Sequence, residues 1–143
     1  MSRVRDIVQQ RELFFVEESA TVAEVARRMA DLQVGAILVL NQRALRGIFS
    51  ERDMMKRVVL GRLDPELTPV SQVMSTDIVT IDADATLEDA MEAMHSHNCR
   101  HLPVTTRGDV TAFLSMRDLM NFELASKTEE LHHMRAYIAS HGA

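Results

Sequence analysis

The stretches GIFSERD at residues 47–53 and AFLSMRD at residues 112–118 decide the fold, because they are two copies of one element. In each, an apolar run ends at a serine, and Ser-x-Arg-Asp follows with the composition of a helix start. They belong to a longer repeat, in which residues 16–58 align with residues 81–123 at a constant offset of 65 and without a gap. Such a repeat indicates one supersecondary unit used more than once. We therefore predict a pseudo-symmetric pair packed face to face, with any cleft between the copies.

The first copy predicts the element order β-α-β-β-α. The apolar run at residues 13–16 indicates a short strand, and Thr21 with Glu24 has the spacing of a capping box at a helix start. Apolar residues at helical spacing then give that helix one buried face. Residues 36–40 predict a buried strand, and residues 45–49 return as a second strand after a polar turn. Ser50 opens a helix that reaches about Leu60.

The second copy predicts the same order, followed by one extra helix. Strands are expected at residues 78–81, 101–105 and 110–114, with helices that begin at Thr86 and Ser115. Residues 121–139 keep roughly one face apolar, which predicts an added helix that packs on the module or on a second subunit. The sequence thus predicts an α+β fold with repeat one at residues 8–62, repeat two at residues 63–122 and a helical tail at residues 123–143.

Composition narrows the class of protein. The 143 residues suit one compact domain, and 46% of them are hydrophobic, which is enough for a core. The net charge of −5 lacks the general basic footprint of a nucleic-acid-binding protein. A single cysteine fits a reducing compartment, and no apolar run has the length of a membrane helix or the form of a signal peptide. These features predict a cytoplasmic protein that binds neither nucleic acid nor membrane.

The repeated strand-to-helix corner has the chemistry of a ribose-phosphate site. Free backbone N–H groups at a helix start attract an anion, and the hydroxyl of Ser50 or Ser115 can donate to a phosphate oxygen. Arg52 or Arg117 can add a charge-assisted bond. The carboxylate that follows each arginine only accepts hydrogen bonds, which suits the two hydroxyls of a ribose. Ser-x-x-Asp is also ordinary capping chemistry, so a structural role explains the same residues and need not exclude ligand binding.

With these features, the chain resembles a tandem pair of CBS domains, the family named for cystathionine β-synthase. Further marks are MSTDIVTI at residues 74–81, which enters the second repeat, and RHLPV at residues 100–104 on its middle strand. The resemblance covers roughly residues 8–122. It implies a non-catalytic regulatory module that binds an adenosine-containing ligand (AMP, ADP, ATP, NAD or S-adenosylmethionine) between the repeats, and that pairs into a flat homodimer.

The resemblance also implies roles for ten residues. Asp53 and Asp118 would hold the ribose. Ser50 with Arg52, and Ser115 with Arg117, would meet the phosphate. The base would lie beside Leu13 or Ile78, and the phosphate side of the second cleft would be lined by Arg100 and His101. Since Gly35 and Ala36 stand at the matching positions of the first repeat, the second cleft is the more cationic, and we favour it for a mononucleotide. The nucleotide is expected as a regulatory ligand, and no cofactor is required.

The sequence leaves one alternative function open and disfavours two others. An adaptor dimer without a physiological nucleotide, which recruits an unidentified protein partner through its tail, is the main alternative. A zinc site is disfavoured, because His95, His97, Cys99 and His101 lack a usual ligand spacing. An enzyme is disfavoured as well, because no acid–base pair or nucleophile–base arrangement has a specific spacing.

Overall fold

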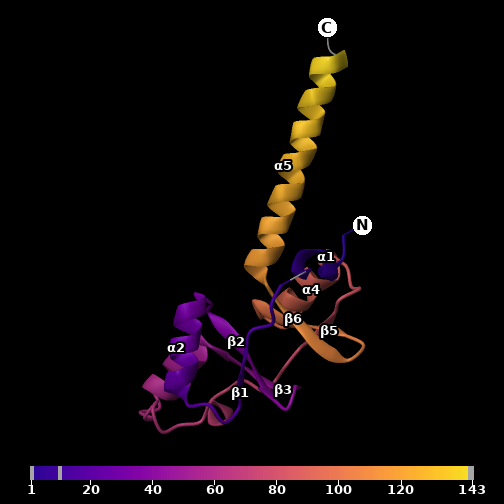
Figure 1. The fold of residues 1–143 in the computed structure, drawn as a ribbon. Coiled ribbons are helices and arrows are strands. Elements are labelled where there is room, and N and C mark those ends of the chain that lie inside the picture. The colour runs from indigo at the N-terminus through magenta and orange to yellow at the C-terminus, as the bar shows by residue number, and fades with distance from the viewer. Residues whose placement is uncertain (1, 10, 142–143) are drawn as a thin grey trace.

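A computed structural model describes residues 2–9 and 11–141, which form two three-stranded sheets with their helices and one long projecting helix (Figure 1). The mixed fold of two similar halves confirms the predicted α+β class. No helix in the described part of the chain is long and apolar enough to cross a membrane.

The first half contains the sheet β1-β2-β3, in which β1 pairs parallel to β2 and β2 pairs antiparallel to β3. Its elements are β1 (Phe15–Glu17), α2 (Val22–Leu32), β2 (Ala36–Asn41), β3 (Ala44–Ser50), the short α3 (Glu51–Asp53) and the π-helix η1 (Met54–Val59). The chain then passes through the 3-10 helix η2 (Val70–Gln72) to the second half.

The second half repeats this topology. Its elements are β4 (Ile81–Asp82), α4 (Leu87–Ser96), β5 (His101–Thr106), β6 (Asp109–Ser115) and α5 (Met116–His141). Even the irregularities repeat, because the β2–β3 ladder shifts register between Val39 and Leu40 and the β5–β6 ladder shifts between Val104 and Thr105. The two shifts lie 65 residues from each other, so the repeat found in the sequence is also a repeat of the backbone conformation.

Local sequence explains the ends of these elements. The hydroxyl of Thr21 accepts a hydrogen bond from the Glu24 N–H at the start of α2, and Thr86 accepts one from Asp89 at the start of α4. The hairpin between β2 and β3 turns through Gln42 and Arg43, both with positive φ, which is the backbone of a two-residue turn that matches strand twist. Arg107 and Gly108 turn the second hairpin in the same way.

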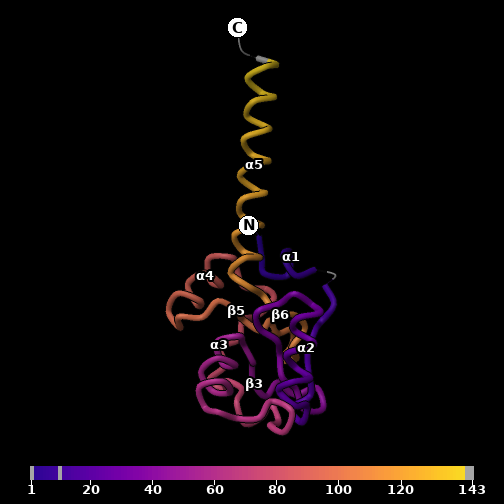
Figure 2. The backbone as a smooth tube through the Cα atoms, turned by 90° about the vertical axis from the view of Figure 1, so that its left-hand side faces the viewer, coloured from indigo at the N-terminus to yellow at the C-terminus, as the bar shows by residue number. Residues whose placement is uncertain are grey.

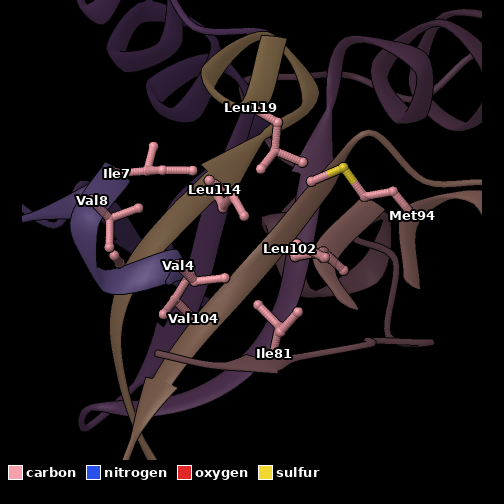
Figure 3. Packing of buried hydrophobic residues seen from close by; sticks show 11 residues of the cluster. Val4, Ile7, Val8, Ile81, Met94, Leu102, Val104, Leu114 and Leu119 are labelled. Atoms are coloured by element: carbon pink, nitrogen blue, oxygen red, sulfur yellow. The ribbon is translucent and has the colours of Figure 1, made fainter. Parts of the chain in front are cut away.

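Each hydrophobic core is completed by a segment that precedes the other repeat. The helix α1 (Val4–Val8) places Val4, Ile7 and Val8 in the core of the second repeat, beside Leu102, Val104 and Leu114 (Figure 3). Conversely, the linker places Val70, Val73 and Met74 in the core of the first repeat. The backbone N–H of Val4 donates to Ala85 O at 2.9 Å, and that of Val70 donates to Ala20 O at 2.8 Å. The two repeats therefore cannot separate without opening both cores.

Several predicted elements differ from those observed. The strand expected at residues 13–16 is β1 at Phe15–Glu17, and the one expected at 78–81 is the two-residue β4. The helix α1 at Val4–Val8 was not predicted from the sequence. The helix after Ser50 is split into α3 and a π-helix, in which Leu60 N donates to Met55 O.

The predicted C-terminal helix is present, and it continues the last helix of repeat two, because α5 runs without a break through residue 141. In the first repeat the matching helix ends in a Schellman motif, where Leu63 N donates to Val58 O and Arg62 adopts a left-handed φ of 55°. Gly61 precedes this turn, whereas Ser126 stands at its matching position and the helix continues. The helix projects far from the sheets in both views (Figure 1, Figure 2).

Candidate functional site

The corner of the first repeat is a closed capping box. The backbone N–H of Ser50 donates to Asp53 Oδ2 at 3.0 Å, and the Ser50 hydroxyl donates to the same oxygen at 3.1 Å. In return, the Asp53 N–H donates to Ser50 Oγ at 3.1 Å. Ser50 and Asp53 are therefore brought together as the sequence predicted, and the Ser50 hydroxyl satisfies the Asp53 N–H at the helix start.

The linker covers this corner from outside the repeat. The Ser75 hydroxyl donates to Asp53 Oδ1 at 2.9 Å, and Arg57 Nε lies 3.9 Å from the same oxygen. Ser75 is held there by a two-hydrogen-bond bridge to Ile48 on β3. Both carboxylate oxygens of Asp53 are thus engaged, and its side chain is only 11% exposed.

The corner of the second repeat has the same helix cap, but a different residue contacts its carboxylate from outside the repeat. The Ser115 N–H donates to Asp118 Oδ2 at 2.8 Å, and the Asp118 N–H donates to Ser115 Oγ at 3.0 Å. Arg11, from the segment before the first strand, pairs with Oδ2 at 2.9 Å. Within residues 2–9 and 11–141, the hydrogen bonds and ion pair of the Asp118 carboxylate all end on Oδ2. Its side chain is 20% exposed, so the second corner is the more accessible of the two.

The electrostatics of the second corner keep Asp118 ionised. Partial burial of the carboxyl opposes its charge, but the hydrogen bond from Arg11, the hydrogen bonds with Ser115 and the charge of Arg11 outweigh it, so the pKa of Asp118 lies below its usual value of 3.8. An ionised carboxylate accepts hydrogen bonds and donates none, which is the state that a diol requires.

His101 lies beside this carboxylate at the start of β5. It pairs with Ser115 across the β5–β6 ladder, and its ring stacks on Phe113 with centroids 5.1 Å apart and an interplanar angle of 29°. Burial lowers the pKa of His101 below 6.5, the nearby Asp118 charge opposes this, and Arg100 adds to it. The imidazole therefore favours its neutral form, in which one ring nitrogen donates and the other accepts.

The other predicted residues differ in their exposure to solvent. Arg52, Arg100 and Arg117 are exposed, whereas Leu13 and Ile78 are half-buried just before their strands. The strands β3 and β6, which end at the two corners, contact each other between the repeats. Three surface cavities lie elsewhere, and Ser50, Asp53, Ser115 and Asp118 line none of these three.

Two site residues were missed by the sequence analysis. Ser75 was part of the motif that enters the second repeat but was given no role, and Arg11 was not singled out. Each lies in a segment that crosses to the opposite repeat. Ser75 contacts Asp53, which is 22 positions away, and Arg11 contacts Asp118, which is 107 positions away. One residue in the sequence could have indicated where the linker crosses, namely Gly47 on β3. Its missing side chain lets the Ser75 backbone approach the strand.

The residues His95, His97, Cys99 and His101 are distributed over α4, the segment after it and β5. In the described residues, no three His, Cys, Asp or Glu side chains converge as metal ligands would. His95 lies in the last turn of α4, His97 caps that helix and His101 lies on β5. Burial raises the pKa of the Cys99 thiol, which disfavours the reactive thiolate.

Comparison with known proteins identifies the family. The CBS domain family model matches twice, at residues 4–60 and 70–125, and these matches cover most of the chain. The chain therefore belongs to the CBS domain family, and its two repeats form a CBS pair, a regulatory module.

Relatives of similar size share the whole arrangement. The CBS domain-containing protein YhcV of Bacillus subtilis is 32% identical over 128 residues, which are 90% of each chain. The crystal structure of the CBS-domain containing protein ATU1752 from Agrobacterium tumefaciens has a TM-score of 0.79 at 26% identity, and the match covers 85% of this chain and 99% of that one. The CBS pair of protein MJ0100, solved in complex with 5′-methylthioadenosine and S-adenosyl-L-methionine, has a TM-score of 0.78 over 88% of this chain and 98% of that one, at 15% identity.

Proposed function

We propose that this protein is a regulatory module that binds an adenine nucleotide, AMP, ADP, ATP or NAD, at the corner formed by Ser115 and Asp118. The observation that carries the proposal is the ionised, partly exposed carboxylate of Asp118, whose Oδ1 is left to accept from a ribose hydroxyl. The solved MJ0100 pair, which shares the fold, supports an adenosine-containing ligand.

The residues around Asp118 suit the rest of a nucleotide. Arg100 and Arg117 are exposed cations next to the corner in sequence, and phosphate binds such groups by charge-assisted hydrogen bonds. His101 lies opposite Ser115 in the ladder and offers a ring nitrogen to the same region. Ile78 and Leu13 are half-buried apolar residues suited to the border of a base. The first corner is the weaker candidate, since Ser75 and Ser50 already engage both oxygens of Asp53.

Isothermal titration calorimetry with AMP, ATP and NAD tests this proposal. Asp118→Asn should weaken the binding of the preferred nucleotide at least about tenfold, because a charged acceptor of the ribose is removed. Asp89→Asn is the matched control, because Asp89 closes the same kind of capping box on α4 with Thr86 and has no place in the proposed site. Equal weakening by both substitutions would show that a loss of helix capping is responsible.

We further infer that the module acts as a cytoplasmic homodimer and without catalysis. Nucleotide occupancy can regulate a partner only if the nucleotide binds two states of the dimer with different affinities. The exposed apolar residues Met55 and Val59 on η1, with Met120 and Leu124 at the matching positions of α5, support association of two copies.

An adaptor without a physiological nucleotide is the second candidate function. It is favoured by one observation, namely that Ser75 and Arg11 already occupy the two carboxylates. If none of the three nucleotides at millimolar concentration gives heat or raises the melting temperature, the adaptor function replaces the nucleotide sensor.

A further inference from the structure

The outer part of α5 leaves the body of the protein and carries apolar side chains with no cover. The helix spans Met116–His141, and Leu119 is its last fully buried residue. From residue 123 to residue 140 every residue is exposed. Besides Tyr137, five large apolar residues on this helix are each at least 50% exposed, namely Met120, Leu124, Leu131, Met134 and Ile138.

These five residues follow a heptad pattern. They fall at spacings of four and three residues when Lys127 is included, in the order Met120, Leu124, Lys127, Leu131, Met134 and Ile138. Alternation of four and three is the spacing of the a and d positions that form the seam of a left-handed coiled coil. With Leu124, Leu131 and Ile138 at a, the d positions are occupied by Met120, Lys127 and Met134.

The flanking charges give the direction of the partner helix. In this register Glu130 occupies a g position and Arg135 occupies the following e position. Parallel helices bring a g residue beside the e residue five positions later on the partner, so Glu130 and Arg135 meet twice across a symmetric pair. Antiparallel helices bring g beside g and e beside e. Glu130 would then meet only glutamate or Tyr137, because Glu123, Glu130 and Tyr137 are the g residues.

Lys127 limits the number of strands. A lysine in the seam of a two-stranded coil can lay its methylene stem across the interface and keep its ammonium group in water. Trimers and tetramers enclose their seams more completely, so they bury that charge at a higher cost. Most of the stability of a helix in a protein comes from packing of its apolar face, so a partner helix along this face would stabilise the projecting segment.

We propose that residues 120–138 of α5 form a parallel two-stranded coiled coil with the same segment of a second copy of the chain. The projection of α5 beyond both sheets leaves room for that second helix along its length (Figure 1, Figure 2). Because the helices are parallel, the twofold axis runs along the coil, and it sets the second repeat of each copy beside the same end of the coil. The proposal defines a geometry for the proposed homodimer and does not depend on nucleotide binding.

Disulfide cross-linking of the full-length protein tests the geometry without any nucleotide. In a Cys99→Ala background, Leu131→Cys places a thiol at an a position, which faces its own counterpart only in a parallel, in-register coil. Ala136→Cys is the matched control, because it places a thiol on the outer f position of the same helix. We expect oxidation to convert most of the Leu131→Cys protein to a covalent dimer and to leave the Ala136→Cys protein largely monomeric on a denaturing gel.

Charge exchange tests the direction and is read from the dimer dissociation constant in sedimentation equilibrium. Glu130→Arg and Arg135→Glu should each raise that constant about tenfold, because each turns two attractive contacts into repulsive ones, and the double variant should restore it. Equal cross-linking of both cysteine variants, failure of Leu131→Cys to cross-link, or a tetrameric mass would overturn the proposal. If the protein is a dimer by sedimentation but Leu131→Cys does not cross-link, the dimer contact lies on the two repeats and not on α5.

Discussion

Arg11 Nη1 lies 2.9 Å from Asp118 Oδ2, so the segment before the first strand is tied to the last strand-to-helix corner of the protein. The contact joins the two ends of the CBS pair and covers the carboxylate that we propose for ribose binding. A ribose hydroxyl on Oδ1 would bind beside this ion pair.

Arg11→Ala should lower the free energy of unfolding by no more than about 1 kcal/mol, because Arg11 is 42% exposed and solvent screens the pair. The folded pKa of Asp118 lies below 3.8, so its stabilisation is present above pH 3.8 and is lost as the pH falls through the folded pKa. Urea unfolding at several pH values should therefore show the difference between the variant and the parent at neutral pH and its disappearance in acid.

Arg5→Ala is the control for this experiment, because it breaks a more exposed ion pair with Asp84 on the same N-terminal segment. Arg5→Ala should change the free energy of unfolding by less than about 0.5 kcal/mol. A similar loss in both variants would mean that the charge of the segment, and not the contact with Asp118, is responsible.

The Arg11 contact is an example of what could not be predicted from the sequence. The repeat predicted the corners correctly, because Ser50 with Asp53 and Ser115 with Asp118 are only three residues apart and a helix start fixes their geometry. It did not predict what covers each corner, since Arg11 and Ser75 come from segments that cross to the opposite repeat. Those crossings depend on packing between α1 or the linker and a distant core, which leaves no fixed spacing in the sequence.

The repeat also implied more symmetry than the helices possess. Its offset extends to residue 123, but the helix of the first repeat becomes a π-helix and ends in the turn at Arg62, whereas α5 continues. Gly61 and Ser126 are the local difference at matching positions. The identical residues fixed the strands and the corners, and the termination of each helix was decided by residues outside the repeat.

His101 should titrate below its usual pKa of 6.5, because burial disfavours its charged form. The native state then binds fewer protons than the unfolded state just below pH 6.5, so stability is complete above that pH and falls as the pH drops through the folded pKa. A proton NMR titration of the His101 ring should give a midpoint below 6.5.

The charge of Asp118 raises the pKa of His101 against the effect of burial, so Asp118→Asn should move the His101 midpoint further down. Arg100→Gln should move it in the opposite direction, because it removes a positive charge that lowers the pKa. An unchanged midpoint in both variants would contradict the electrostatic account of this corner.

Gly47→Ala should destabilise the first repeat, because a Cβ at this position would lie 2.8 Å from Ser75 O and 2.6 Å from Met74 Sδ. The backbone oxygen cannot move without breaking the bridge between Ser75 and Ile48. Overpacking of this kind costs about 1–3 kcal/mol, which urea unfolding can measure. Gly35→Ala is the control, since its Cβ would meet Glu51 at an ordinary 3.5 Å, and its stability should change little.

Substitution of Asp53 should mainly lower the stability of the protein, whereas substitution of Asp118 should mainly lower its affinity for nucleotide. Asp53→Ala removes a helix cap and leaves the Ser75 hydroxyl without its acceptor in a buried place, so the free energy of unfolding should fall by about 2–3 kcal/mol. Asp118→Ala removes a comparable cap at a more exposed corner, where water can replace the lost contacts, and should cost about 1 kcal/mol. Nucleotide affinity should follow the opposite order, with the larger loss in Asp118→Ala.

Thermal unfolding and calorimetric titration of the same two variants measure both quantities together. Titrations should be run well below the melting temperature of Asp53→Ala, so that its weaker folding does not lower the apparent affinity. If Asp53→Ala remains as stable as the parent protein and loses nucleotide binding, the first corner is the ribose site. Ser75 would then be a residue that the ribose displaces, and the greater burial of Asp53 would reflect a site that opens on binding.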